Sequence, residues 1–338
     1  MDLELLEQAA RRRLDAAFYD YIAGGSEDEE TLVDNAAAWS RMRLRPKVLR
    51  DVDRVDLSTT ALGAPVASPI GVAPMAMQHR ACEDGPVATA RAAAATGSLL
   101  VFGLFGAGSA GGVAEVESTA PRWLQVYVLK DRARSAAAIA RSVEEGYAAL
   151  VLTVDVVRQG NRRRDARNRW VFLREGDEAE EDPNELFDRS LTFDDIAWFR
   201  ERAGVPLVIK GVMRGDDAAA CVDAGAAAVI VSNHGGRQLD GAAATADVLR
   251  EVVEAVGDRG EVYVDGGIRR GQHVLKALAL GARGVMLGRP VMWGLAAGGR
   301  LGAQAVLRGF QQELERAMAL SGVRSVPEIG PDLLHERG

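Results

Sequence analysis

Residues 261–290 read EVYVDGGIRRGQHVLKALALGARGVMLGRP, and they contain one complete unit of the expected fold. The first part, Glu261–Gly267, is a short apolar run of the kind that forms a buried strand. The segment Gln272–Leu280 has helical periodicity and stops at Gly281, a residue type that commonly follows a helix end. A second apolar run, Gly284–Pro290, comes next. A strand, a helix and another strand in this order predict a parallel pair joined by a right-handed crossover.

The same unit recurs along the chain from about residue 66. Eight apolar runs are predicted as strands: Pro69–Pro74, Ser98–Leu104, Arg122–Val128, Ala148–Asp155, Pro206–Gly211, Ala227–Asn233, Glu261–Gly267 and Gly284–Pro290. Helical segments lie between them, among them Gly85–Thr96, Ala133–Glu145, Phe193–Ala203, Asp216–Ala224, Ala243–Val256 and Gln272–Leu280. We therefore predict a closed (β/α)8 barrel, a fold that takes roughly 250 residues. A doubly wound sheet would more often show GxGxxG after its first strand, and this chain has none there.

The segments outside the barrel complete a predicted single domain of residues 1–338. Residues 1–65 form an N-terminal cap, with an amphipathic helix at Leu3–Ala23 and an irregular stretch after it. The barrel core takes residues 66–300, and residues 301–338 form a C-terminal helix, roughly Leu301–Leu320, with a tail. The acidic segment Leu173–Ser190, without apolar periodicity, is predicted to be a mobile loop after the fourth strand.

Composition excludes several classes of protein. The 338 residues are 48% hydrophobic and 26% charged, which is ordinary for a packed globular chain. A net charge of −7 argues against nucleic-acid binding, and no apolar run approaches the roughly 20 residues that span a bilayer. The charged N-terminus is unlike a signal peptide, and Cys82 and Cys221 form neither a disulfide framework nor a zinc motif. We expect a cytoplasmic protein without a metal site.

Polar residues follow the predicted strands at the ends where barrel enzymes carry their chemistry. From the third strand to the eighth these are Gln125, Tyr127, Thr153, Asp155, Lys210, Ser232, Asn233, His234, Asp265, Gly267, Gly288 and Arg289. A single such residue is as often a cap or a turn former, but six successive strands ending this way indicate a site. The turns after strands seven and eight, with Arg269 and Arg289, favour phosphate binding over simple tight turns with surface arginines.

His234 at the end of the sixth strand is a candidate general base, because Asp155 nearby would fix its tautomer. A lone histidine is more commonly a hydrogen-bonded core residue. Lys210, Arg162 and Arg237 change this balance, because three cations facing one pocket are costly unless they meet an anion. A carboxylate substrate together with an anionic cofactor would satisfy them.

Four segments together resemble one family. They are LTVDVVRQGNRRRDARNR (152–169), VIKGVMRGDDA (208–218), SNHGGRQLD (232–240) and VDGGIRRGQHVLKALALGARGVMLGRPVMWGL (264–295). In this order they are similar to the FMN-dependent α-hydroxy acid oxidases and dehydrogenases, which include glycolate oxidase, lactate oxidase and mandelate dehydrogenase. The resemblance runs from about Phe18 to Gly322.

The resemblance implies a role for each matching residue. His234 would be the catalytic base and Asp155 its partner, with Tyr127 and Lys210 also catalytic. Substrate binding would fall to Tyr21, Tyr127, Arg162 and Arg237. The residues implied to bind FMN are Pro74, Met75, Ala76, Gln125, Thr153, Lys210, Ser232, Asp265, Gly267, Arg269, Gly288 and Arg289.

The chain departs from the family pattern at the second strand. VFGLFGAGS (101–109) stands where the family usually has a Ser-Ser pair, so a bulky side chain in the substrate wall would be replaced by Gly106 or Ala107. Val157 also replaces a common proline. We therefore expect a widened pocket that takes an aryl or otherwise large 2-hydroxy acid.

The reaction partners implied are a small 2-hydroxy acid and an electron acceptor. Ala76 stands where oxidases often have Ala, which favours dioxygen over a quinone or a carrier protein. The resemblance also implies a homotetramer. Two other hypotheses remain: oxidation of an amine or a peptide-derived intermediate in natural-product tailoring, and a non-catalytic flavin-binding barrel.

Overall fold

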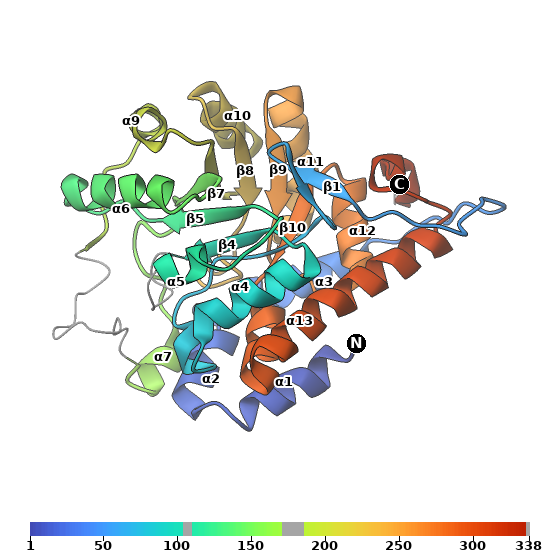
Figure 1. The fold of residues 1–338 in the computed structure, drawn as a ribbon, viewed down its shortest axis with the longest axis horizontal. Coiled ribbons are helices and arrows are strands. Elements are labelled where there is room, and N and C mark those ends of the chain that lie inside the picture. Colours follow the sequence, from blue (N-terminus) through green and yellow to red (C-terminus); the bar gives the residue numbers. More distant parts are fainter. Residues whose placement is uncertain (104–109, 171–185, 336–338) are drawn as a thin grey trace.

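The computed structural model of the chain describes residues 1–103, 110–170 and 186–335. Eight parallel strands form a closed barrel in the order β10-β3-β4-β5-β6-β7-β8-β9 (Figure 1). They are β3 (Ile70–Val72), β4 (Leu100–Gly103), β5 (Arg122–Val126), β6 (Ala149–Thr153), β7 (Leu207–Val212), β8 (Ala228–Val231), β9 (Glu261–Val264) and β10 (Gly284–Leu287). Seven lie within a predicted run, and β7 extends one residue beyond its run, to Val212, so the prediction of a (β/α)8 barrel is confirmed.

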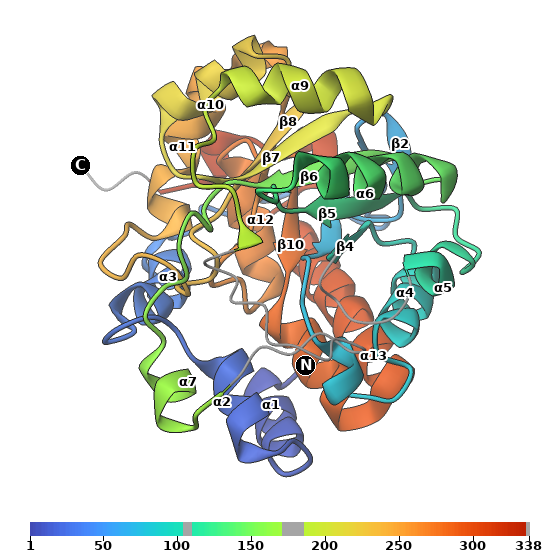
Figure 2. The ribbon, with the colours of Figure 1, turned by 90° about the vertical axis from the view of Figure 1, so that its left-hand side faces the viewer.

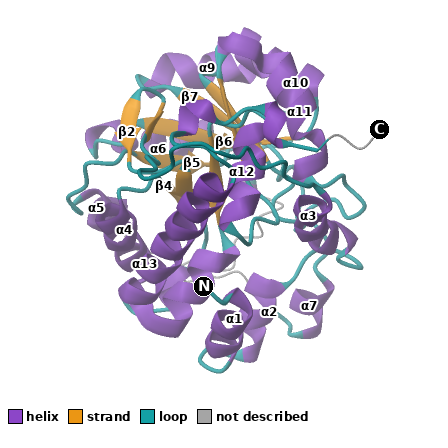
Figure 3. Cartoon of the chain, turned by 90° about the vertical axis from the view of Figure 1, so that its right-hand side faces the viewer, coloured by secondary structure: helices purple, strands orange, loops and turns teal. Residues whose placement is uncertain are grey.

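Helices surround this barrel (Figure 3). They are α4 (Gly85–Thr96), α5 (Ala110–Ala114), α6 (Arg132–Glu144), α7 (Arg163–Arg167), α9 (Asp194–Ala203), α10 (Gly215–Asp223), α11 (Thr245–Val256), α12 (Gly271–Ala279) and α13 (Arg289–Leu320). The last helix begins earlier than expected and is kinked at Gly298 and Gly299, where the backbone is not helical. No helix in the described part of the chain has the length and apolarity needed to cross a membrane.

The strands are apolar on both faces, and each face has its own packing partner. Outward side chains such as Leu150 and Leu207 join the core beneath the helices, together with the buried Phe199 and Phe310. Inward side chains fill the barrel itself, where the rings of Trp123 and Tyr263 meet edge to face at 5.3 Å. Because side chains fill the interior, it is a packed core, and the space for a ligand lies beyond the strand ends.

The N-terminal segment differs from the single helix predicted over Leu3–Ala23. Two helices occur instead, α1 (Leu3–Arg11) and α2 (Ala16–Ala23), and the prediction of one helix was wrong. Asp15 begins the second helix, because its carboxylate accepts a hydrogen bond from the backbone N–H of Phe18 at 2.8 Å. Because the apolar periodicity continues across this turn, the sequence pattern did not indicate that the helix ends and a second one begins.

A third helix, α3 (Glu30–Arg41), and a short antiparallel hairpin were not predicted. The hairpin consists of β1 (Thr59–Ala61) and β2 (Ala64–Val66) and is separate from the barrel. Figure 2 shows α1, α2 and α7 together on one side of the barrel. The helix α7 belongs to the segment after β6, so chain regions more than a hundred residues apart meet there.

The predicted loop Leu173–Ser190 falls largely outside the described residues, which resume at residue 186. Just after that point Phe187 forms an isolated antiparallel bridge with Leu129. Gly106 and Ala107, on which the expected widening of the pocket depends, also lie outside the described residues.

Candidate active site

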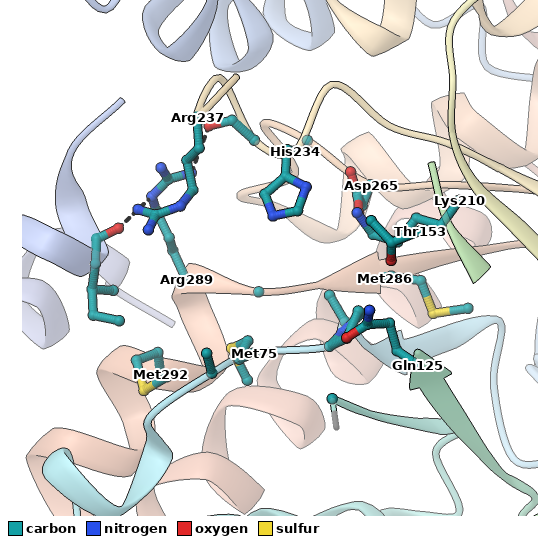
Figure 4. A pocket seen from close by; sticks show the side chains of 18 of the residues that line it. Met75, Gln125, Thr153, Lys210, His234, Arg237, Asp265, Met286, Arg289 and Met292 are labelled. Carbon is teal, nitrogen blue, oxygen red and sulfur yellow. Dashed lines mark hydrogen bonds and ion pairs between the residues drawn. The ribbon is translucent and has the colours of Figure 1, made fainter. Parts of the chain in front are cut away.

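The carboxyl ends of the barrel strands surround one pocket, and most of the predicted site residues line it (Figure 4). Two predicted residues, Asp155 and Ser232, are not in the lining, but each contacts a residue that is. The predicted residues that do line it are Tyr21, Pro74, Met75, Ala76, Gln125, Tyr127, Thr153, Arg162, Lys210, His234, Arg237, Asp265, Gly267, Arg269, Gly288 and Arg289.

His234 projects into this pocket from the turn after β8 (Figure 4). Its Nδ1 lies 3.0 Å and 3.2 Å from the two carboxylate oxygens of Asp155. An ionised carboxylate only accepts, so this pairing places the proton on Nδ1 and leaves Nε2 as the proton acceptor. The backbone of His234 has φ 57°, an uncommon left-handed conformation, and its N–H donates to Ser232 Oγ at 3.1 Å. The turn therefore fixes the direction of the ring, and Asp155 fixes its tautomer.

The electrostatics of the pair favour a neutral imidazole beside an ionised acid. Burial lowers the pKa of His234 below its ordinary value, and the nearby Lys210 acts in the same direction against Asp155. Burial opposes ionisation of Asp155, but His234 and Lys210 outweigh it and lower the pKa of that carboxyl. At neutral pH His234 is therefore ready to accept a proton.

Asp155 reaches its position because β7 has a bulge at Gly211. The register between β7 and β8 shifts between Lys210 and Val212, and Gly211 has φ 110°. A Cβ on Gly211 would lie 2.6 Å from the Cβ of Asp155. Only glycine combines this conformation with that close approach, which links the bulge directly to the histidine's partner.

Lys210 is a buried cation that lines the pocket. Its Nζ donates to Ser232 Oγ at 2.9 Å and lies 3.5 Å from Asp265 Oδ2. Burial alone would lower the pKa of Lys210, but the carboxylates of Asp265 and Asp155 outweigh this and raise it. The ammonium therefore remains charged, and a group that gains negative charge nearby would be stabilised.

Arg162 and Arg237 lie with Tyr21 at the side of the pocket. The guanidinium of Arg237 lies 4.6 Å from the centre of the Tyr21 ring, and that of Arg162 lies 5.9 Å from it. Burial, together with the like charge of Arg162, lowers the pKa of Arg237 to about 10. The like charges of these two guanidinium groups repel one another, and a bound carboxylate would relieve that repulsion.

The phenol of Tyr127 completes this side. Burial and the negative charge of Asp155 raise its pKa, so the hydroxyl stays protonated and can donate. Its ring stacks on Phe187, with the ring centres 4.6 Å apart.

Arg269 and Arg289 place two further positive charges at the turns that follow β9 and β10. Burial lowers the pKa of both, and neighbouring arginines add to the effect at Arg289. The guanidinium of Arg289 donates to the carbonyl oxygens of Ile22 at 2.8 Å, Gly24 at 2.8 Å and Gly235 at 3.0 Å. The same arginine therefore borders the predicted phosphate position and fastens the end of α2 to the His234 turn.

Three buried polar atoms in the pocket have no hydrogen-bond partner among the described residues: Gln125 Nε2, Thr153 Oγ1 and Asp265 Oδ1. They come from β5, β6 and the end of β9, and a buried unpaired polar atom costs about 1–3 kcal/mol. One large ligand with both donors and acceptors would satisfy all three. A flavin ring with its ribityl hydroxyls and phosphate has that chemistry, and the arginines supply the countercharge for the phosphate.

Sequence reasoning did not identify several residues of the lining. Phe187 follows the predicted loop, and its place depends on the long-range bridge with Leu129, which leaves no local signal. Met286 and Met292 belong to β10 and the start of α13 and were given no role. Val156 and Gln159 follow Asp155 in the segment quoted for the resemblance and went unassigned.

Comparisons with known proteins agree with this geometry. The family model described as FMN-dependent dehydrogenase matches residues 10–336. L-lactate oxidase of Nostoc sp. is 44% identical, with 97% of this chain and 96% of that protein covered. 2-Hydroxyacid oxidase 1 of Homo sapiens is also 44% identical, with 98% and 95% covered. Among solved structures, that of mandelate oxidase superposes with a TM-score of 0.93 at 38% identity, covering 99% of this chain and 98% of that one.

A family match over nearly the whole chain and a barrel that superposes on a solved relative lead to one conclusion. The cofactor is FMN. The chain belongs to the FMN-dependent dehydrogenase family and is an enzyme of its 2-hydroxy acid oxidase group.

Proposed function

We propose that this enzyme oxidises an L-2-hydroxy acid with an aryl or otherwise bulky side chain to the 2-oxo acid, and that dioxygen is the electron acceptor. The observation that carries the proposal is the His234–Asp155 pair at 3.0 Å, placed in one pocket with a pair of arginines and a buried lysine. This arrangement offers a base, a carboxylate-binding site and a charge that stabilises a reduced acceptor.

FMN would be held by residues from most of the strands. Gln125, Thr153 and Asp265 would bond the ring and ribityl chain, since their free polar atoms face the pocket. Arg269 and Arg289 would bind the phosphate, together with the backbone at Gly267 and Gly288. Pro74, Met75 and Ala76, which follow β3, would lie along the ring, with Lys210 and Ser232 at its polar edge.

The substrate carboxylate would bind between Arg162 and Arg237, because a guanidinium matches a carboxylate with two parallel hydrogen bonds. Tyr21 and Tyr127 would donate their hydroxyls to the carboxylate and to the 2-hydroxyl. With the substrate held by these contacts, its 2-hydroxyl group points toward His234, where the base is required.

The proton balance of the reaction defines the tasks of His234 and Asp155. FMN, when bound, supplies the two-electron acceptor for the hydrogen on the substrate's C2. His234 Nε2 takes the proton of the hydroxyl group, and Asp155 stabilises the imidazolium that results. The substrate loses two electrons and two protons to become the 2-oxo acid, and dioxygen takes up two electrons and two protons to form hydrogen peroxide.

The preference for a bulky side chain is supported by the apolar part of the lining. Phe187 stacks on Tyr127, and Val156 and Met292 add apolar surface to the same pocket. An aryl group buries its area against such side chains and stacks favourably on aromatic rings. The structure of mandelate oxidase among the relatives agrees with a substrate of this kind.

A substrate panel tests this proposal. The purified holoenzyme is assayed for oxygen consumption with (S)-mandelate, L-lactate, glycolate and a matching 2-amino acid. We expect kcat/KM for mandelate to exceed that for glycolate by at least about tenfold, a difference of about 1.4 kcal/mol. If glycolate or L-lactate is the best substrate, the bulky preference is wrong, and if only the amine reacts, the reaction class is wrong.

A further inference from the structure

Three aromatic rings pack behind the proposed substrate site. Trp170 and Tyr21 stack with ring centres 5.0 Å apart and planes 22° apart. Phe18 lies 5.8 Å from Trp170 and 6.0 Å from Tyr21, again nearly parallel. Of these rings only that of Tyr21 lines the pocket, so Trp170 and Phe18 act behind it.

Two arginines border this group of rings. The guanidinium of Arg80 lies 4.7 Å from the centre of Trp170, and that of Arg237 lies 4.6 Å from the centre of Tyr21. Attraction between a guanidinium and a ring face is worth about 0.5–1 kcal/mol at exposed sites and more when desolvated. Arg80, Trp170, Tyr21 and Arg237 therefore form one continuous chain of contacts that ends at the carboxylate-binding site.

The chain of contacts joins segments distant in sequence. Tyr21 is on α2, Trp170 follows α7, and Arg80 ends a short 3-10 helix, Gln78–Arg80, after β3. Arg80 also donates to the carboxylate of Asp15 at 2.9 Å, and Asp15 is the residue that starts α2. Arg80 thus fixes the start of the helix that carries Tyr21, and Trp170 fixes the Tyr21 ring.

Further polar contacts hold α7 against α2. Asn168 donates to the Asp20 carboxylate at 2.8 Å, and Arg164 Nη1 lies 3.6 Å from Asp20 Oδ1. The backbone N–H of Trp170 donates to the carbonyl oxygen of Asp165 at 2.9 Å. These contacts determine where the indole ring can lie, and that position is beside Tyr21.

The indole N–H of Trp170 is buried and has no hydrogen-bond partner among the described residues. A buried donor without a partner is unfavourable, so the tryptophan is not kept here for its hydrogen bond. What its position provides is a flat ring surface against Tyr21.

We propose that Trp170 is a positioning residue for substrate binding, which holds the Tyr21 ring against Arg237 so that its hydroxyl meets the substrate carboxylate. The inference rests on the proposed function, in which Tyr21 and Arg237 bind that carboxylate. Because the carboxylate is bound alike before and during the reaction, loss of the contact raises KM and leaves kcat nearly unchanged. A structural role alone would not separate the two constants in this way.

The test compares four variants of the holoenzyme with the wild type. Trp170→Leu removes the ring, Trp170→Met fills the space without a ring, and Trp170→Phe keeps a ring without the N–H. Trp198→Leu is the control, because Trp198 on α9 also contacts an aromatic ring, meeting Phe199 edge to face at 4.7 Å, and lies under Arg202 at 4.3 Å, but it does not line the pocket.

The measured quantities are KM, kcat and the dissociation constant of a 2-oxo acid, phenylglyoxylate, followed by the flavin absorbance change. An aromatic pair is worth about 0.5–1.5 kcal/mol, so we expect the leucine and methionine variants to raise KM and this dissociation constant roughly 3- to 10-fold. The phenylalanine variant should stay within about twofold of the wild type, as should the Trp198→Leu control.

A Tyr21→Leu background shows whether the effect passes through Tyr21. We expect Trp170→Leu to have no further effect on phenylglyoxylate binding there, because the ring that it positions is gone. Equal effects in both backgrounds, a phenylalanine variant as weak as the leucine variant, or unchanged binding in Trp170→Leu and Trp170→Met would overturn the inference. A wild type that neither binds phenylglyoxylate nor oxidises any 2-hydroxy acid would refute the proposed function instead.

Discussion

His234 combines an unusual backbone conformation with a fixed hydrogen bond, and both serve its proposed role as base. Its φ of 57° aims the ring into the pocket, while Asp155 at 3.0 Å orients it. A side chain exposed to 20%, beside an Asp155 exposed to 11%, is open enough to reach a substrate yet largely shielded from water. Residues held in such conformations are enriched at functional sites.

Replacing this base should abolish the reaction without emptying the cofactor site. We expect His234→Ala to retain FMN and to reduce the rate of flavin bleaching by substrate at least about a hundredfold, because general base catalysis is worth 10²–10⁴. Stopped-flow absorbance under nitrogen measures it. Unchanged bleaching in a variant with full flavin content would show that another group takes the proton.

The pH profile should report the lowered pKa of His234. Because only the neutral imidazole accepts a proton, kcat/KM rises with pH through this pKa, and the midpoint should lie below about 6.5, the ordinary value. Asp155→Asn removes the charge that stabilises the imidazolium, so it should shift the rise to still lower pH. A midpoint above about 7 in the wild type, or a shift upward in the variant, would contradict this assignment.

At the scale of elements, α3 ties the N-terminal segment to the turn that carries His234. Asn35 on α3 and Asn233 exchange two amide hydrogen bonds, both of 2.9 Å. Asp240, beyond the same turn, accepts from the backbone N–H groups of Thr31 at 2.9 Å and Glu30 at 3.3 Å. The start of this helix is therefore capped by a residue 210 positions away in the chain.

Removing this long-range cap should destabilise the fold measurably. We expect Asp240→Ala to lower the free energy of unfolding by about 1–2 kcal/mol, the usual value of a helix N-cap. Urea unfolding of the holoenzyme measures it. Asp332→Ala is the control, because Asp332 is exposed and forms a surface ion pair with Lys47, worth at most about 1 kcal/mol. An equal or larger loss in the control would show that the cap contributes nothing special.

The elements also show how far local patterns predict the fold. The eight strands were predictable because a strand covered on both faces must be apolar throughout. The break between α1 and α2 was not, because the apolar pattern crosses Asp15 without interruption. Nor was α3, whose start is capped from residue 240 and not from its own sequence.

At the scale of the whole molecule, the pocket is complete only when distant regions come together. The barrel supplies His234 and the buried Lys210, and the N-terminal segment supplies Tyr21. Arg289 joins the two parts through the carbonyl oxygens of Ile22 and Gly24. The strand-end residues could be predicted from sequence because the fold brings strand ends together, but Phe187 and the position of Trp170 depend on contacts between segments and could not.

The cofactor should stabilise this whole arrangement. FMN added to the apoprotein at about 100 times its Kd should raise the free energy of unfolding by about 2.7 kcal/mol, because it binds only the folded chain. Riboflavin at the same concentration should stabilise less, since it brings no phosphate to Arg269 and Arg289. Equal shifts in the urea midpoint with both compounds would contradict the proposed phosphate site.

The measurement that tests the central claim most directly is the visible absorbance of the holoenzyme, recorded anaerobically before and after addition of (S)-mandelate. We predict flavin bands that bleach on addition and return when air is admitted, with hydrogen peroxide formed. Flavin bands that neither mandelate nor any smaller L-2-hydroxy acid bleaches would contradict the account of His234 as the base of a 2-hydroxy acid oxidase.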